Sequence, residues 1–229
     1  MLTVVWSVKG GTGCTVVAAS LAMIKARDQG RCIVVDLAGD LPAALGMAEP
    51  GGPGVTEWLA SAEGDAESLE RLLVSVHAGE TGSGLDLLPV GAGREWPPDR
   101  ADRLVSALRT LGVPVVVDAG HVEGGPEHRW SSALHAVGRR VRDAGTSLLV
   151  MRPCYLALRR AVGLRAEADG VVLVRDSGRA LDRRDIADVL DLPVVAAVDV
   201  DPAVARAVDA GVLTRRLPRA MERQLRSAA

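Results

Sequence analysis

Short apolar runs alternate along this chain with longer segments in which apolar residues recur at helical spacing. Runs rich in Val, Leu and Ile without a polar face are typical of parallel strands that are covered on both sides. Seven such runs predict strands at 2–8, 32–36, 85–90, 113–118, 147–151, 171–174 and 194–198. The segments between them predict helices near 15–28, 55–77, 99–111, 126–143, 154–167, 180–190 and 202–210.

This alternation predicts an α/β fold with a mostly parallel, seven-stranded sheet and helices on both faces. Loops rich in Gly and Pro separate the elements at 49–54, 79–84 and 91–98. None of them is long enough to be a convincing interdomain linker, and there is no internal repeat. We therefore expect one domain over residues 1–229.

The loop after the first strand has the composition of a phosphate-binding loop. Residues 8–15 read Val-Lys-Gly-Gly-Thr-Gly-Cys-Thr. In the pattern G-x-x-x-x-G-K-[ST], backbone N–H groups and a lysine hold phosphate, and the hydroxyl holds Mg²⁺. Gly13 and Thr15 stand in register with that pattern, whereas Val8 replaces the first glycine and Cys14 replaces the lysine.

A lysine followed by two glycines resembles the deviant Walker A loop, K-G-G-x-G-K-T, of the ParA/MinD family of P-loop ATPases. The resemblance implies ATP and Mg²⁺ as cofactors and a homodimer, in which Lys9 reaches the partner's nucleotide. It implies a nucleotide site formed by Lys9, Gly10, Gly11, Thr12, Gly13, Cys14 and Thr15. A glycine-rich turn in some other α/β protein is the alternative.

Two predicted strands end in an aspartate, where ligands of parallel sheets bind. Asp118, in Val-Val-Val-Asp-Ala-Gly, resembles the family's Walker B aspartate, so the resemblance implies that it holds Mg²⁺ with Thr15; a plain turn residue is the alternative. Asp36 opens a segment resembling the family's switch region, where the second aspartate of D-x-D orients the attacking water. Ala38 has that spacing and Asp40 follows, so Asp40 and Lys9 are the catalytic candidates.

Three positions depart from the family's nucleotide contacts together: Cys14, Ala38 and Arg175, the last where the family often offers an asparagine to adenine. A thiol cannot replace an ammonium group beside phosphate. A helix N-terminus lowers a thiol pKa, so we expect some thiolate at Cys14, which would repel phosphate further. These departures predict a degenerate P-loop with weak or absent ATP binding.

Two functions remain open. One is a dimeric scaffold or positioning protein with weak or no ATP hydrolysis, acting on an unidentified protein partner. The other is an active ATP-dependent dimerisation switch for DNA segregation, septum placement or pilus-machinery placement. Residues 39–46, Gly-Asp-Leu-Pro-Ala-Ala-Leu-Gly, resemble most closely the CpaE/TadZ branch, which helps to place pilus machinery.

Charge and composition leave two surface partners open. The net charge of -2 does not favour nucleic-acid binding by the protein as a whole. Arginines 139, 140, 142, 159, 160 and 165 nevertheless cluster on two predicted helices, which keeps non-specific DNA open. Residues 214–226 are basic, with Leu217, Met221 and Leu225 four apart; they predict either a membrane-surface helix or a last helix packed on the sheet.

The remaining chemistry is weakly indicated. Three scattered cysteines give no disulfide framework, and no signal layout or long apolar stretch is present, so we expect a cytoplasmic protein. His121, His128 and His135 are spaced by seven, and metal ligation competes there with a solvated surface. Cys14 has no His or acid near it in sequence to activate it as a nucleophile.

Overall fold

A computed structural model describes residues 1–76, 84–93, 95–97, 99–121, 132–163 and 167–229. It contains one eight-stranded sheet with the order β3-β4-β2-β5-β1-β6-β7-β8. The strands are β1 (Leu2–Ser7), β2 (Cys32–Asp36), β3 (Val74–Ser75), β4 (Leu85–Leu88), β5 (Val115–His121), β6 (Thr146–Met151), β7 (Gly170–Arg175) and β8 (Val194–Asp199). All neighbours are parallel except β3 and β4. The predicted mostly parallel α/β fold is confirmed.

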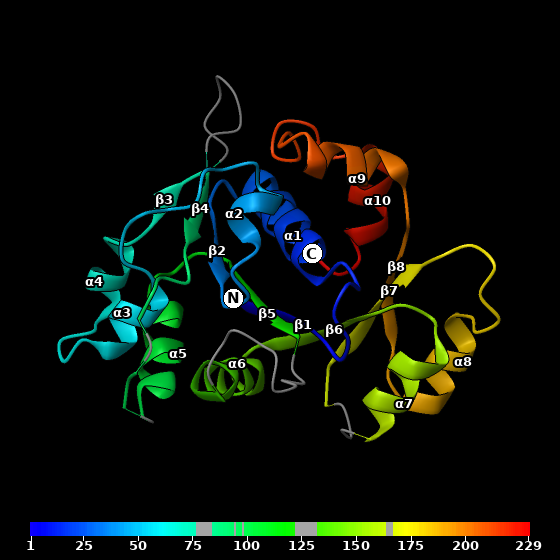
Figure 1. Ribbon diagram of the computed structural model, residues 1–229, viewed down its shortest axis with the longest axis horizontal. Helices are drawn as coiled ribbons and strands as arrows, with labels where there is room; N and C mark the ends of the chain where they lie inside the picture. The colour runs from blue at the N-terminus through cyan, green and yellow to red at the C-terminus, as the bar shows by residue number, and fades with distance from the viewer. Residues whose placement is uncertain (77–83, 94, 98, 122–131, 164–166) are drawn as a thin grey trace.

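Helices cover both faces of the sheet, with α1, α2, α9 and α10 on one side and α5 to α8 on the other (Figure 1). The helices are α1 (Cys14–Gln29), α2 (Leu41–Ala44), α3 (Val55–Ala60), α4 (Ala66–Glu70), α5 (Arg100–Thr110), α6 (Ser132–Ala144), α7 (Tyr155–Gly163), α8 (Arg183–Leu190), α9 (Pro202–Asp209) and α10 (Arg219–Leu225). Six predicted helices correspond to α1, α5, α6, α7, α8 and α9; residues 126–131 and 164–166 of two of them lie outside the described residues.

The core follows from the alternation of side chains along the buried strands. Val5 faces α1 and packs in one cluster with Leu21. Val4 points to the opposite face and packs with Leu104 of α5. All six residues of β1 are buried, because this strand lies between β5 and β6 and is covered from both sides. The apolar runs in the sequence thus mark strands whose two faces both lack water.

The predicted strand count was one too low, and the predicted helix over 55–77 was wrong. That segment forms α3, α4 and the two-residue strand β3, which adds antiparallel to β4 at the sheet edge. The helix breaks because the backbone becomes extended at Ser61 and turns at residues 62–63. The Asp65 carboxylate then accepts a hydrogen bond from the Ser68 N–H at 2.7 Å and caps α4. Trp58 donates from its indole to the Asp65 carbonyl at 3.0 Å, which fixes α3 against α4.

No helix within the described ranges is long and apolar enough to cross a bilayer. The last helix, α10, packs against α1 and β8, as the second interpretation of residues 214–226 predicted. Met221 and Leu225 of α10, and Leu217 just before it, are all buried in the cluster that contains α1. The apolar side of this basic segment is therefore already covered by the protein itself.

Candidate functional site

The glycine-rich loop lies between β1 and α1 at the carboxyl edge of the sheet. Gly11 and Gly13 have φ values of 72° and 90°, a region that L-residues with side chains rarely adopt. A Cβ added at Gly10, Gly11 or Gly13 would meet no heavy atom of the described residues within 4 Å. The loop backbone is thus open on its outer side, and the first N–H groups of α1 follow it directly.

The Ser7 hydroxyl lies between this loop and β5. Its single proton can be donated either to the Lys9 carbonyl oxygen at 3.2 Å or to the buried Gly120 carbonyl oxygen at 3.4 Å. Gly120 has a φ of 64°, and a side chain there would come within 2.9 Å of Ala38. The sequence analysis did not single out Ser7 or Gly120; the glycine two residues after Asp118 was the available signal.

Cys14 occupies the first position of α1 and points into the protein. Its side chain is only 7% exposed, and the thiol lies 3.5 Å from Asp118 Oδ1 and 3.8 Å from the Gly120 carbonyl oxygen. Burial, and then the charge of Asp118, raise the pKa of the Cys14 thiol well above its usual value. The expected thiolate is wrong: the helix N-terminus is outweighed by burial and by the neighbouring carboxylate.

Asp36 is the last residue of β2 and stands opposite Asp118 on the neighbouring strand β5, which continues to His121 beyond its predicted end. The Asp36 carboxylate accepts hydrogen bonds from the N–H groups of Ala38 at 3.0 Å, Gly39 at 2.6 Å and Leu41 at 3.2 Å. Asp118 Oδ1 accepts from the Gly120 N–H at 3.0 Å, whereas its buried Oδ2 has no hydrogen-bond partner among the described residues. Both carboxylates are fully buried, with 0% exposure.

Burial dominates the electrostatics of this pair. Burial, and next the charge of Asp118, raise the pKa of Asp36 to about 7 in spite of its three N–H donors. Burial also raises the pKa of Asp118, against the lowering effect of the Thr15 hydroxyl and the Gly120 N–H. Within the described residues no Lys or Arg forms a salt bridge with either carboxylate. The site therefore concentrates negative charge behind the loop.

The structure brings most of the candidate residues to this edge. Thr15 lies close enough to Asp118 for its hydroxyl to influence that carboxyl, as the predicted metal pair requires. Asp40 is exposed at the start of α2, yet its charge still raises the pKa of Asp118. Lys9 is half-buried, and Thr12 is buried with a hydroxyl that has no hydrogen-bond partner among the described residues. Their binding roles remain predictions.

Two candidates lie elsewhere or outside the description. Arg175 at the end of β7 pairs with Asp199 at 2.7 Å, so its guanidinium is already engaged beside the place predicted for a base. His121 ends β5, whereas His128 and the side chain of His135 lie outside the described residues. Across the described part of the chain, no group of three or more His, Cys, Asp or Glu side chains is arranged to hold a metal ion.

The residues present fit only half of a nucleotide site. The open glycine backbone and the N-terminus of α1 suit an anion, and the unpaired Asp118 Oδ2 with Thr15 suits a hydrated Mg²⁺. The phosphate-gripping cation is absent, and a neutral thiol paired with a carboxylate takes its place. On charge, the site does not fit ATP.

Neither a protein-family model nor a curated protein matches the sequence. Solved structures do match it over almost its whole length. A ParA family ATPase from Chlorobium tepidum TLS is 20% identical with a TM-score of 0.76, covering 98% of this chain and 95% of that one. The MinD cell division protein of Aquifex aeolicus is 19% identical with a TM-score of 0.74, covering 99% and 93%.

A third match is the septum site-determining protein MinD complexed with Mg-ADP from Pyrococcus horikoshii OT3. It is 20% identical with a TM-score of 0.70, covering 99% of this chain and 94% of that one. The chain has the ParA/MinD fold. Within this ParA/MinD fold, the glycine loop, Asp36 and Asp118 all meet at the carboxyl edge of the central strands β1, β2 and β5.

Proposed function

We propose that this protein is a ParA/MinD-like positioning protein that acts as a dimeric scaffold and binds or hydrolyses ATP weakly or not at all. The observation that carries the proposal is the contact of the neutral Cys14 thiol with Asp118, at 3.5 Å, where the fold's nucleotide-binding relatives are expected to have a lysine. The resemblance of residues 39–46 to the CpaE/TadZ branch favours the placement of a pilus-type machine, in the cytoplasm, through a protein partner.

The charge of the site supports the scaffold over the active switch. A lysine about 4 Å from a phosphate oxygen contributes about 4 kcal/mol at an effective dielectric near 20. This chain lacks that contribution and also carries two buried carboxylates, Asp36 and Asp118, behind the same loop. Among the described residues, a triphosphate would therefore approach a site that attracts it through backbone N–H groups and Lys9.

Calorimetry with ATP and Mg²⁺ tests this proposal on three proteins: the native chain, Cys14→Lys, and Cys14→Met as a neutral control of similar length. We expect no saturable binding for the native chain and Cys14→Met, and at least about tenfold tighter binding for Cys14→Lys, which corresponds to about 1.4 kcal/mol. In a parallel sedimentation experiment, the native chain should form the same dimer with and without nucleotide.

The active switch is the second candidate, and the open glycine loop with the adjacent Thr15 and Asp118 favours it. It predicts measurable ATP turnover in the native chain that Asp118→Ala abolishes, together with dimers that form only with ATP. Either result would replace the scaffold proposal, because Lys9 or an arginine would then be compensating for Cys14.

A further inference from the structure

Helix α7 exposes an unusual amount of apolar surface for its length. Ala157, Leu158 and Ala161 point inward and pack in the cluster below the helix. On the outer side Tyr155 is 74% exposed, and Leu156 and Val162 are about half exposed, at 45% and 50%. Only three other large apolar side chains in the described residues are exposed, namely Met1, Val189 and Val200. Half of this exposed apolar set therefore lies on one nine-residue helix.

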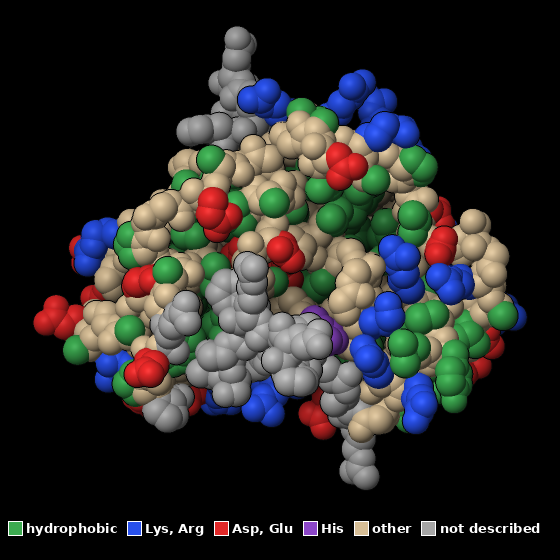
Figure 2. Space-filling model, viewed as in Figure 1, with side chains coloured by type: hydrophobic (Ala, Val, Ile, Leu, Met, Phe, Trp, Pro, Cys, Tyr) green, Lys and Arg blue, Asp and Glu red, His purple; other side chains and the backbone are tan. Residues whose placement is uncertain are grey.

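Arginines surround the same face. Figure 2 shows apolar side chains gathered over α7 and bordered by Lys or Arg side chains. Arg159 is exposed and, among the described residues, forms no ion pair or side-chain hydrogen bond. Arg152 and Arg179 both approach the same carboxylate, Asp176, at 4.0 Å and 3.0 Å. Because one carboxylate faces two guanidinium groups, the border of this apolar face keeps an excess of positive charge.

Helical spacing interleaves the two kinds of side chain. Tyr155, Arg159 and Val162 are related by four and seven residues and share one stripe of α7. Leu156 and Arg160 form a second stripe beside it, again four residues apart. The outer side of α7 thus offers apolar and cationic groups alternately, rather than a purely apolar or a purely basic surface.

We propose that this outer side of α7 docks an acidic amphipathic segment of a partner protein. Tyr and Arg are the residue types that dominate well-packed interfaces, and they gain most when neighbouring apolar groups exclude water. Carboxylates of the partner can pair with the guanidinium groups, whose planar fork suits a carboxylate. The inference gives a partner chemistry to the scaffold proposed above and rests on it to that extent.

An acidic protein segment suits the surface better than DNA or lipid. Binding to a phosphate backbone needs cations and gains little from Tyr155, Leu156 and Val162. A membrane-surface helix needs a broad apolar face, whereas Arg159 stands between the apolar residues of α7. The mixed pattern matches an amphipathic protein segment that carries both apolar anchors and carboxylates.

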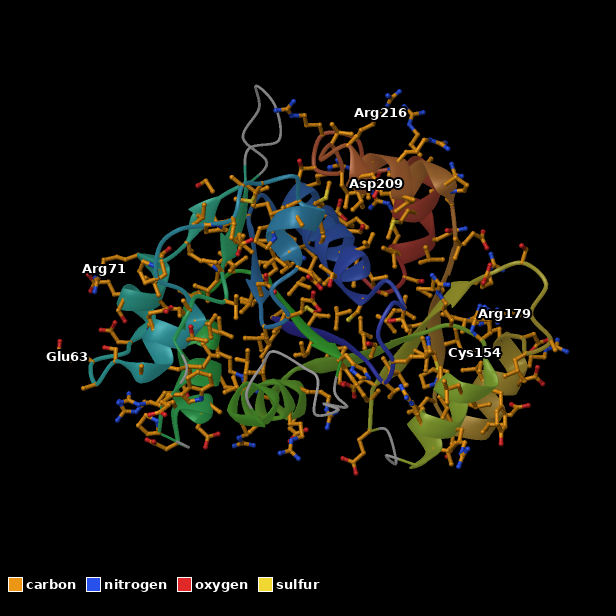
Figure 3. The ribbon with its side chains drawn as sticks, in the orientation of Figure 1. Glu63, Arg71, Cys154, Arg179, Asp209 and Arg216 are labelled. Atoms are coloured by element: carbon orange, nitrogen blue, oxygen red, sulfur yellow. The ribbon has the colours of Figure 1, made fainter. Side chains whose placement is uncertain are left out.

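The docking face and the start of the glycine loop pack on the same hydrophobic cluster. The buried side of α7 packs in the same cluster as Trp6 and Val8, and Val8 directly precedes Lys9. Figure 3 shows Cys154, which directly precedes α7, and Arg179 on the same part of the molecule. A partner on α7 would thus sit on the elements that hold the first residues of the loop.

Selection from a displayed library of short random peptides tests the inference, with the native protein as bait and the double variant Tyr155→Ser/Arg159→Glu as counter-bait. We expect enriched peptides to combine Asp or Glu with apolar residues at helical spacing. Their affinity, measured by fluorescence anisotropy, should fall at least about tenfold in the double variant. Tyr155→Phe should retain binding. Arg216→Glu, a matched charge reversal well away from α7 in Figure 3, should also retain it.

Several outcomes would overturn the docking surface: no α7-dependent peptides, enriched peptides without acidic residues, or equal binding after their acidic residues are changed to lysine. Duplex DNA or phosphatidylglycerol vesicles bound by the native protein, lost in Arg159→Glu but unchanged in Tyr155→Ser, would assign the surface to phosphate groups instead. None of these experiments uses nucleotide. If the native protein binds ATP tightly and acidic peptides are still selected, only the scaffold proposal is refuted. If it binds no ATP and no acidic peptides are selected, only the docking surface is refuted.

Discussion

The neutral Cys14 thiol leaves the charge of the neighbouring carboxylates unbalanced. Asp36 at the end of β2 pairs with Asp118 within β5, and the Cys14 thiol lies 3.5 Å from Asp118. Buried carboxylates without a cation prefer to keep a proton. The apo protein therefore carries an electrostatic penalty at this edge that depends on pH.

We expect the protein to be more stable at about pH 5 than at about pH 8. The pKa of Asp36 is raised from 3.8 to about 7, so between these values the folded protein holds a proton that the unfolded chain has released. The folded state binds more protons there, and its stability falls as pH rises through about 7. At 1.36 kcal/mol per unit, the loss for this group between about pH 5 and about pH 8 is at most roughly 3 kcal/mol, because it accumulates only up to about pH 7. Denaturant unfolding at the two pH values measures it.

Asp118→Asn isolates the cause of that dependence. The amide keeps Oδ1 as acceptor for the Gly120 N–H and removes the charge from the position of the unpaired Oδ2. The variant should unfold at higher denaturant than the native chain at about pH 8, and its stability should change less with pH. Asp40→Asn is the control: it removes an exposed carboxylate at the same edge, whose charge raises the pKa of Asp118 less than burial does, so it should change stability much less than Asp118→Asn does. A native chain whose stability rises toward pH 8 would contradict the charge penalty.

Sequence patterns predicted the site's backbone and missed its electrostatics, for a physical reason. The glycine loop and the two strand-end aspartates follow local patterns that can be read along the chain. The Cys14 contact with Asp118 joins residues 104 positions apart, and burial of the thiol depends on how β5 packs behind the loop. The helix N-terminus was the only influence visible in sequence, so the direction of the Cys14 pKa was mispredicted.

Among the elements, the buried parallel strands were predictable and the edge was not. A strand such as β1, apolar on both faces, cannot be confused with a surface segment. The strand β3 has only two residues, Val74 and Ser75, and carries no periodicity. The prediction of one helix over 55–77 followed its apolar residues at helical spacing. It gave too little weight to Gly64 and to Asp65, the residue that caps α4.

Close approach between two loops gives a prediction for the elements around α1. Gly46 follows α2 with a φ of 70°, and a Cβ there would lie 2.0 Å from the Gly211 carbonyl oxygen, after α9. Gly46→Ala must separate these loops and should cost about 2–4 kcal/mol, from backbone strain and overpacking together. Denaturant unfolding measures the loss.

Gly30→Ala is the matched control for this prediction. Gly30 ends α1 with a similar φ of 82°, but a Cβ there meets no heavy atom of the described residues within 4 Å. It should therefore cost only about 1 kcal/mol, the backbone strain alone. Equal losses in the two variants would show that the approach of Gly46 to Gly211 does not constrain the fold.

For the whole molecule, the packing of α10 bears on whether the proposed scaffold would act at a membrane surface or through a protein partner. The arginine-rich side of α10 faces outward, and Arg216 and Arg223 are exposed. The apolar side packs against the protein core: Leu225 is 0% exposed, and the Met221 sulfur lies 3.5 Å from the Ser20 hydroxyl of α1. Inserting that side into a bilayer would require α10 to leave α1 and β8 and expose this part of the core.

We therefore expect the native protein not to co-sediment with phosphatidylglycerol vesicles at physiological salt, because exposed arginines alone are screened over about 8 Å. Leu225→Ala should destabilise the fold by about 2–5 kcal/mol, as loss of a fully buried leucine does. If α10 were a membrane anchor, the same change would instead weaken vesicle binding and leave the unfolding midpoint almost unchanged. Arg223→Ala, on the exposed side of the same helix, should leave both quantities unchanged. Vesicle binding by the native chain that Leu225→Ala abolishes would mean that α10 detaches, and positioning would then proceed through a lipid surface.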